Sequence, residues 1–573
     1  MFQGTLSPHI GNLSFLAALI LVNNSFFGFL PQEISRLHRL KMFQLPFNQL
    51  EGSIPPGLHK CHQLTHLSLR ANKLSGSIPK DLGMLPMLRK LDLSRNSFMG
   101  AIPSSLSNLS SIEALNLEYN NLIGPFPFDL FNVSSLVMIA LSENHLSGTL
   151  PMDLCRNCPN LQQVYLSGNK FSGQIPSQLN SCRELIDLSL SYNKFEGGIP
   201  KSFGTLQKLG GLVLGGNYLT GNIPPTLSNL SMLYAFGIET NNIKGSIPRE
   251  LGLLPNLIIL DVGDNPLTGA IPNSIFNMSS LQEIYMANCS LSGNLPLDAG
   301  LSCPNLEYLI LNTNELNGRI SSSLSNCSQL VAVDFIENLL SGPIPASLGN
   351  MKYLQKLFLS LNQLTGEPSL LSSLFNSTSL EVVRIGGNPL DISLPYSIGN
   401  TSASLQTLIA SLCQIKGHIP MGISSLTGLI NLDLSNNYLI GNMPSSFGRL
   451  GKLQRLDVSN NGIEGFIPEN LCQLENLGAL DFSNNKISGS IPDCISNLTF
   501  LRRLYLGSNK LKSSIPLNVW LLESLLFLDL SSNSLGGYLP PNMKQAETIE
   551  HIDLSRNQIT GNIPSIIGAF ESL

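Results

Sequence analysis

LTHLSLRAN, at residues 64–72, continues as KLSGSIP at residues 73–79, and this phrase returns along the chain about every 24 residues. Its leucines alternate with polar residues, as in a strand that is buried on one side. Asn72 ends the strand, and its amide can donate to and accept from the backbone of neighbouring turns. Gly76 permits a tight turn before a short helical return. A repeat of this length predicts a solenoid, in which each unit packs only on its neighbours.

The ladder formed by this asparagine has 23 rungs, and 21 of them are Asn; Cys289 and Cys413 fill the other two. Leucine spacing and period predict an α/β repeat solenoid of the leucine-rich repeat type. We expect a parallel β-sheet on the concave face and short 3₁₀ or helical returns on the convex face. Residues 1–573 are predicted to form a single solenoid, with irregular longer repeats at about 363–413. Both ends fall in mid-repeat, so we expect the chain to be a truncated piece of a longer protein.

The composition excludes several partners. The formal net charge is -5 and there is no run of Lys or Arg, so nucleic acid is not an expected partner. No apolar stretch reaches the roughly 18 residues that a membrane span needs. The opening MFQGTLSPHIG lacks the regions of a signal peptide. Membrane attachment is therefore expected only through segments outside this sequence.

No catalytic constellation is present in the sequence. The eight histidines fall in no HExxH motif and beside no GxSxG elbow. The glycine-rich run GGLVLGGN at 210–217 has no following GK[ST], so we interpret it as a strand with small exposed residues. We predict no enzyme activity and no cofactor for this chain.

Five of the ten cysteines share one phase, three residues before the first strand leucine. This phase is typical of buried apolar filler; the five are Cys61, Cys158, Cys182, Cys303 and Cys327. Cys158 and Cys182 lie in adjacent rungs, so a disulfide between them is an alternative in an oxidising compartment. The single CxxC at 155–158 lacks the second pair that zinc would need, so no metal is predicted.

Eleven Asn-x-Ser/Thr sequons occur, and nine of them fall on the return side of the repeat. Either NLS simply belongs to the repeat consensus, or glycans cover the convex and lateral sides and leave the concave face bare. The second alternative suits an extracellular binding solenoid. The sequon asparagines are Asn12, Asn23, Asn108, Asn132, Asn229, Asn277, Asn288, Asn326, Asn376, Asn400 and Asn497.

The exposed strand positions lie six, four, two and one residues before the ladder residue. From Asn437 to Asn557 many rungs repeat Asp-x-Ser, which we interpret as a structural row. Between Asn120 and Asn362 tyrosines and carboxylates break this pattern, and Lys and Arg are nearly absent. Tyrosines on a rigid sheet make large contacts at small entropic cost, and carboxylates attract a basic partner. The alternative is that these are ordinary solvated strand residues. The predicted ligand-binding residues are Glu118, Tyr119, Glu143, Tyr165, Tyr192, Glu239, Asp261, Asp264, Glu283, Tyr285, Tyr308, Glu337 and Phe358.

Two segments carry a resemblance to a known family. The whole chain resembles the plant-type leucine-rich repeats of receptor-like kinases. LSPHIGNLSFL at 6–16 and the irregular stretch at 369–406 are similar to the subfamily of flagellin and bacterial elongation-factor receptors. The resemblance implies a glycoprotein ectodomain outside the plasma membrane that senses a peptide or protein, perceives pathogen patterns in plant defence, and pairs with a co-receptor kinase near its C-terminal rungs. The membrane helix, the serine/threonine kinase and the cysteine caps of that family are absent from this sequence.

Other function classes remain open at this stage. An enzyme inhibitor like the plant polygalacturonase inhibitors would need fewer repeats. A steroid receptor would interrupt the solenoid with an island domain, and no ladder step here exceeds 26 residues. A receptor-like protein without a kinase, or a nonfunctional receptor fragment, would carry the same repeats.

Overall fold

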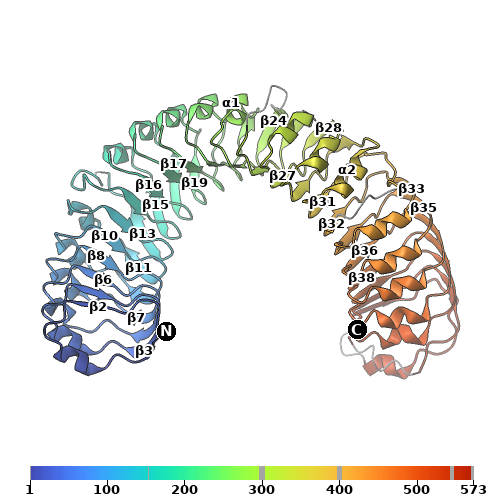
Figure 1. The fold of residues 1–573 in the computed structure, drawn as a ribbon, viewed down its shortest axis with the longest axis horizontal. Coiled ribbons are helices and arrows are strands. Elements are labelled where there is room, and N and C mark those ends of the chain that lie inside the picture. The colour runs from blue at the N-terminus through green and yellow to red at the C-terminus, as the bar shows by residue number, and fades with distance from the viewer. Residues whose placement is uncertain (1, 153, 296–302, 397–402, 542–547, 570–573) are drawn as a thin grey trace. The chain divides into compact units, whose positions relative to one another are not determined.

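The computed structural model describes residues 2–152, 154–295, 303–396, 403–541 and 548–569. The chain divides into two compact units, Met1–Ser290 (unit 1) and Leu291–Leu573 (unit 2). In each unit the repeats stack, so that one strand of each repeat joins a parallel sheet and a short helical turn covers the side opposite to it (Figure 1). This arrangement confirms the predicted leucine-rich repeat solenoid.

The first strand of each repeat carries the two central leucines. His66 lies opposite Met42 on one side and Lys90 on the other, so neighbouring strands are parallel and exactly one repeat apart in register. Leu67 and Leu69 are at most 1% exposed, and each such side chain contributes about 2 kcal/mol of burial free energy. The outward residues, at the four positions given above, form what we call the strand face.

In unit 1 these first strands are β2 (Ala18–Ile20), β4 (Met42–Gln44), β6 (His66–Ser68), β8 (Lys90–Asp92), β10 (Ala114–Asn116), β12 (Met138–Ala140), β14 (Gln163–Tyr165), β16 (Asp187–Ser189), β18 (Gly211–Val213), β20 (Ala235–Gly237), β21 (Ile259–Asp261) and β23 (Glu283–Tyr285). In unit 2 they are β25 (Tyr308–Ile310), β27 (Ala332–Asp334), β29 (Lys356–Phe358), β31 (Val382–Arg384), β32 (Thr407–Ile409), β34 (Asn431–Asp433), β36 (Arg455–Asp457), β38 (Ala479–Asp481), β40 (Arg503–Tyr505), β42 (Phe527–Asp529) and β44 (His551–Asp553).

The ladder asparagines satisfy backbone groups of two consecutive turns. Asn72 Nδ2 donates to the carbonyls of Leu45 and Leu69 at 3.0 Å, and its Oδ1 accepts from the backbone amide of Leu50 at 3.0 Å. The amide therefore connects its own strand to the preceding repeat. Buried backbone groups cost free energy when they lack such partners, so the recurrence of Asn is explained by the turn that it closes.

At the two rungs where the ladder residue is a cysteine, the side chain can donate a hydrogen bond as asparagine does, but it has no amide oxygen to accept one. Cys413 Sγ lies 3.2 Å from the carbonyl oxygen of Ile385 and can donate to it, but the thiol supplies no amide oxygen. The backbone amide of Leu390, which an asparagine would accept from, instead donates to the carbonyl of Asn388 at 2.8 Å. Where the ladder residue is a cysteine, this backbone amide is therefore satisfied by a carbonyl of its own turn.

A second strand follows most ladder residues and begins the turn at the glycine. Gly76 has a φ of 80°, which confirms the predicted need for glycine. In unit 1 the second strands are β1 (Gln3–Gly4), β3 (Ser25–Phe29), β5 (Gln49–Gly52), β7 (Lys73–Gly76), β9 (Ser97–Gly100), β11 (Asn121–Pro125), β13 (His145–Thr149), β15 (Lys170–Gln174), β17 (Lys194–Gly198), β19 (Tyr218–Thr220) and β22 (Thr268–Gly269). The others, up to the C-terminal repeats, are β24 (Ser290–Asn294), β26 (Glu315–Arg319), β28 (Leu339–Pro343), β30 (Gln363–Thr365), β33 (Lys416–His418), β35 (Tyr438–Asn442), β37 (Gly462–Gly465), β39 (Lys486–Gly489), β41 (Lys510–Ser514) and β43 (Ser534–Gly536).

The returns are short 3₁₀ helices, as predicted, and they start after the proline that fixes φ. In unit 1 they are η1 (Pro8–Asn12), η2 (Gln32–Arg36), η3 (Leu58–Lys60), η4 (Lys80–Met84), η5 (Ser104–Asn108), η6 (Phe128–Asn132), η7 (Ser177–Ser181), η8 (Lys201–Thr205), η9 (Pro225–Asn229), η10 (Arg249–Leu253) and the α-helical α1 (Asn273–Phe276). In unit 2 they are η11 (Ser322–Asn326), η12 (Ala346–Asn350), η13 (Met421–Ser425), η14 (Ser445–Arg449), η15 (Glu469–Gln473), η16 (Asp493–Asn497), η17 (Leu517–Leu521), η18 (Ser565–Ala569) and α2 (Leu370–Asn376), which lies in the predicted irregular stretch.

Candidate functional site

The residue just before each ladder position has a left-handed backbone, which the sequence pattern did not reveal. The φ angles are 54° at Tyr119, 53° at Tyr192 and 52° at Asp264 in unit 1. The same position in unit 2 is held by Asn436 at 56° and Asn460 at 53°. Asn tolerates this conformation, whereas a tyrosine there is strained. Strained residues that persist in a fold are concentrated at functional positions.

Three polar side chains of unit 1 converge on one carboxylate. Tyr165 Oη donates to Asp187 Oδ2 at 2.9 Å, and Tyr234 Oη donates to Asp187 Oδ1 at 2.7 Å. Gln163 Nε2 lies 3.3 Å from Asp187 Oδ2 and donates to it. Burial and the bond to Asp187 raise the pKa of Tyr165, and the same causes raise the pKa of Tyr234 to about 12. Both tyrosines therefore remain neutral donors, and they hold the carboxylate in one position.

Tyr234 reaches Asp187 across two repeats because the repeat between them carries glycine. A Cβ built on Gly211 would lie 2.6 Å from Asp187 Oδ1 and 3.2 Å from Tyr234 Oη, and one on Gly210 would lie 2.7 Å from the Tyr234 ring. The run GGLVLGGN is the strand with small residues that was predicted. The space that side chains would fill on this rung is occupied by its neighbours, so Gly211 is buried beneath Asp187 and Tyr234, and Gly215 is buried beneath Glu239.

Carboxylates follow on the next rungs without a cation beside them. Burial and repulsion from Glu239 raise the pKa of Asp261 to about 6, and burial raises the pKa of Glu239. Burial also raises the pKa of Glu118, at the N-terminal end of this surface, although Arg70 and Arg95 act in the opposite direction. Glu239 and Asp261 are held in an environment that opposes their charge, and a cation placed beside them would relieve that cost.

The strand face of eight rungs from Ala114 to Asn288 carries neither Lys nor Arg, and we call this surface the acidic face. Its aromatic side chains are accessible, since Tyr119 is 45% and Tyr192 is 62% exposed. Arg95, on the preceding rung, lies over the Tyr119 ring at 4.3 Å and marks the N-terminal edge of the surface. The acidic face combines accessible tyrosines with unneutralised carboxylates.

Of the thirteen predicted ligand-binding residues, the first ten fall on the acidic face and the last three, Tyr308, Glu337 and Phe358, lie in unit 2. Phe358 is covered by Arg384 at 5.2 Å, and Glu337 accepts from Thr313 Oγ1 at 3.2 Å. The prediction omitted two residues of the acidic face, Asp187 and Tyr234. Asp187 occupies a strand-face position, so phase alone would have found it, whereas Tyr234 lies one residue outside the predicted positions.

The strand face from Asn431 to Arg556 in unit 2 is different, and we call it the Asp-Ser face. Asp433 Oδ1 accepts from the backbone amide of Ser435 at 3.0 Å and from its hydroxyl at 2.7 Å. Asp481 and Ser483 repeat the same contact, at 2.9 Å and 2.6 Å. The predicted structural row of Asp-Ser is confirmed here, because one oxygen of each of these carboxylates is bound by the serine of its own rung.

The chain is similar to a known repeat family and to several solved structures. The leucine rich repeat family matches residues 452–511 and eight further segments, which are 63–85, 87–109, 160–182, 184–206, 256–278, 428–450, 524–546 and 548–570. No curated protein gave a significant match. Among solved structures, the plant peptide hormone receptor RGFR1 in complex with RGF2 is 31% identical, with a TM-score of 0.85 over 98% of this chain and 92% of that chain.

Two Arabidopsis receptor kinases are similar as well. HAESA in complex with the peptide hormone IDA and the co-receptor SERK1 is 30% identical, with a TM-score of 0.80 over 97% of this chain and 89% of that chain. The ectodomain of GASSHO1/SCHENGEN3 in complex with CASPARIAN STRIP INTEGRITY FACTOR 2 is 32% identical, with a TM-score of 0.66 over 100% and 80%. The chain belongs to the plant leucine-rich repeat receptor ectodomains. In the described part of this ectodomain no helix is long and apolar enough to cross a membrane.

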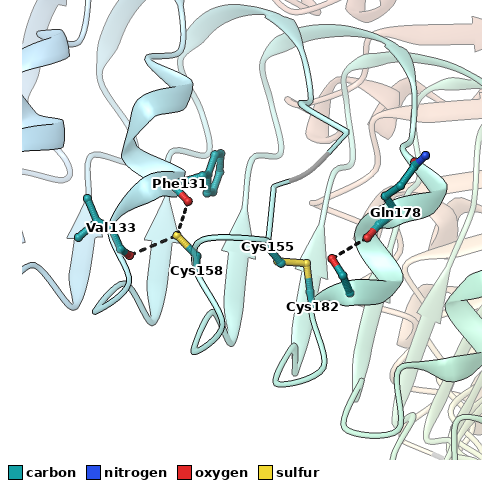
Figure 2. The surroundings of a disulfide bond; sticks show 7 residues. Phe131, Val133, Cys155, Cys158, Gln178 and Cys182 are labelled. Atoms are coloured by element: carbon teal, nitrogen blue, oxygen red, sulfur yellow. Dashed lines mark hydrogen bonds between the residues drawn. A yellow bond between two sulfur atoms is a disulfide. The ribbon is translucent and has the colours of Figure 1, made fainter.

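The disulfides of the ectodomain differ from the predicted one. Cys182 bonds to Cys155, with Cα atoms 5.1 Å apart, so the predicted pairing with Cys158 is wrong (Figure 2). Cys158 Sγ instead points into the core and lies 2.7 Å from the carbonyl of Phe131 and 3.2 Å from that of Val133. Burial raises the pKa of the Cys158 thiol to about 11. The shared phase had correctly indicated a buried side chain, but it could not show which cysteine faces Cys182.

A second disulfide, between Cys472 and Cys494, was not predicted. It joins η15 to η16, with Cα atoms 5.8 Å apart. Among the described residues, each unit therefore has one disulfide, which joins neighbouring returns on the side opposite to the strand face.

The sequon asparagines are accessible on the ectodomain. All ten that lie among the described residues are exposed, and Asn400 falls outside the described residues. Asn108, Asn229 and Asn497 each end a 3₁₀ return, whereas Asn23 and Asn288 lie at the edge of the strand face. Asn288 Nδ2 donates to Asp264 Oδ1 at 2.7 Å, so a glycan there would disturb the acidic face.

Proposed function

We propose that this ectodomain binds an extended basic peptide along the acidic face of unit 1. The observation that carries the proposal is the absence of Lys and Arg from the strand-face positions of eight successive rungs, on which the carboxyls of Glu118, Glu239 and Asp261 have raised pKa values. A peptide that brings Lys or Arg beside Asp261 and Glu239 would restore ionisation and gain charge-assisted hydrogen bonds.

The glycine rung and the tyrosines supply the rest of the contact. Gly211 and Gly215 are covered by Asp187, Tyr234 and Glu239, so the glycine rung lets polar side chains of its neighbours converge on one place. Tyr192 on the preceding rung and Tyr234 on the following rung flank it with accessible amphipathic rings. Rigid tyrosines are frequent anchors in binding sites because they order little on binding. The peptide hormone receptor RGFR1, in complex with RGF2, and HAESA, in complex with the peptide hormone IDA, support this ligand class.

The parent protein is proposed to be a receptor kinase at the plasma membrane, with this glycosylated region outside the cell. A co-receptor kinase would bind near the C-terminal rungs, and the structure of HAESA with SERK1 supports that class of partner. The role in defence, and the subfamily of flagellin and elongation-factor receptors, depend only on the segments at 6–16 and 369–406. The extension of the ligand site to Tyr308, Glu337 and Phe358 remains a proposal for unit 2.

Calorimetry tests the proposal with two peptides of equal length, one rich in Lys and Arg and one rich in Asp and Glu. We expect the basic peptide to bind the acidic face, and only its binding to be weakened, at least about tenfold, by Tyr165→Ala combined with Tyr192→Ala. Tyr505→Ala is the matched control, because Tyr505 has the same position as Tyr165 in its repeat but lies on the Asp-Ser face. No binding of the basic peptide, an equal loss for both peptides in the tyrosine variant, or an equal loss in the control would refute the site.

A further inference from the structure

A hollow of about 580 Å³ lies beside the Asp-Ser face of unit 2, at the start of strands β36 to β42. Three arginines line it, and no acidic side chain does; its lining is Gln454, Arg455, Asn476, Gly478, Ala479, Phe500, Arg502, Arg503 and Leu526. The strand register places Arg455 opposite Ala479 and Ala479 opposite Arg503. The middle repeat is therefore the one with small residues, and arginines border it on both sides.

The spacing of the arginines fits a small anion. Strands about 4.8 Å apart put the Cα atoms of Arg455 and Arg503 about 10 Å from each other. When one guanidinium is hydrogen-bonded to each side of a carboxylate, the two donor nitrogen atoms lie roughly 8 Å apart. Gly478 supplies the room, because a Cβ built there would come no closer than 3.6 Å to any neighbour.

The guanidinium groups are largely available for such a ligand. In the described part of the chain, Arg502 and Arg503 form no ion pair with a carboxylate, and both side chains are exposed. Arg503 lies over the ring of Phe527, its neighbour on β42, at 5.6 Å. Arg455 makes a 3.4 Å contact with Asp457 Oδ2, while Asp457 Oδ1 is bound by Ser459. The carboxylates of the neighbouring row are thus partly satisfied within their own rungs.

We propose that Arg455, Arg502 and Arg503 form a carboxylate-binding pocket for an acidic side chain of a partner protein. Arg presents paired donors that match a carboxylate, so the pocket selects that group over a neutral amide. The exposed ring of Phe500 and Leu526 at the rim favour an apolar residue next to the acidic one. The pocket has the opposite charge preference to the acidic face and does not depend on peptide binding there.

Fluorescence anisotropy on the whole chain tests the pocket with labelled Glu-Leu-Glu-Leu-Glu, blocked at both ends. We expect it to bind and the corresponding Gln peptide not to bind. The combined variant R502A/R503A should weaken binding at least about tenfold. The charge-matched control R449A/K512A, on η14 and β41, should leave binding unchanged. A neutral peptide with a free C-terminal carboxylate distinguishes the source, and we expect it to bind more weakly than the Glu peptide.

Filling the hollow gives an independent test. Gly478→Glu places a carboxylate among the arginines and should abolish binding, whereas Gly478→Gln should have a smaller effect. Binding that is equal for the Glu and Gln peptides, or unchanged in R502A/R503A, would overturn the proposal, as would stronger binding of the free C-terminus. Tyr165→Ala with Tyr192→Ala must leave Glu-peptide binding intact, so failure of the peptide site and failure of this pocket are distinguishable.

Discussion

The acidic face of unit 1 and the Asp-Ser face of unit 2 are built on the same repeat but use it differently. On the Asp-Ser face, Asn436 and Asn460 occupy the left-handed position, and each aspartate binds the serine of its own rung. On the acidic face, Tyr119 and Tyr192 occupy that position. The Asp187 carboxylate there is shared across repeats rather than within one.

The comparison distinguishes residues that stabilise the repeat from residues that the repeat accommodates at a cost in stability. Each aspartate of the Asp-Ser face is bound by the serine of its own rung, so this row is explained by local stability. Left-handed residues other than Asn occur on both faces, as Arg556 shows, but tyrosines in that position occur only on the acidic face, together with the raised pKa values of Glu239 and Asp261. This difference is what supports the proposal that the acidic face binds a ligand.

Loss of a ladder asparagine should lower the unfolding free energy by the same amount under the acidic face and under the Asp-Ser face. Asn193→Ala and Asn485→Ala each remove three donated hydrogen bonds and one accepted bond. We expect each variant to lose about 3 kcal/mol of unfolding free energy, because buried backbone groups are left unpaired. Urea unfolding followed by circular dichroism measures it. A loss in one unit only would mean that the two faces do not share one scaffold.

The disulfides offer a second comparison between units. Cys182→Ser and Cys494→Ser should each destabilise their unit by about 2–3 kcal/mol, since each bond restricts the unfolded chain. Cys158→Ser should cost less, about 1 kcal/mol, because Cys158 makes only weak thiol contacts. Peptide mapping under non-reducing conditions checks the pairing, and a Cys158–Cys182 bridge in the native chain would contradict the structure.

The ionisation of Asp261 gives a pH-dependent test. Its folded pKa of about 6 lies above the ordinary value of 3.8, so ionisation destabilises the fold as the pH rises through that window. Asp261→Asn should be more stable than the parent by on the order of 1 kcal/mol at pH 7, and equal to it below about pH 4. The same variant should bind the basic peptide more weakly. Thermal unfolding at the two pH values decides the first point.

Exchanging the left-handed residues gives the smallest effect. Tyr192→Asn should stabilise unit 1 by about 0.5–1 kcal/mol, and Asn460→Tyr should destabilise unit 2 by a similar amount. Only Tyr192→Asn should also weaken peptide binding. If Tyr192→Asn is destabilising, the tyrosine packs favourably and strain does not distinguish the two faces.

Sequence was sufficient for the repeat, the ladder and the helical returns because each depends on contacts within one repeat or with the next. Asn72 and Gly76 show this, since spacing alone predicts their bonds and backbone. The Tyr234–Asp187 contact could not be predicted, because it spans two repeats and requires the space above Gly211. The Cys155–Cys182 pairing depends on the path of a return that forms no regular helix.

Photo-crosslinking tests the central claim most directly. A basic peptide that carries a photoreactive residue would be irradiated with the whole chain, and the crosslinked fragments identified by mass spectrometry. We predict crosslinks to the strand-face residues between Ala114 and Asn288. Crosslinks concentrated between Asn431 and Arg556 would contradict the assignment of the ligand to the acidic face.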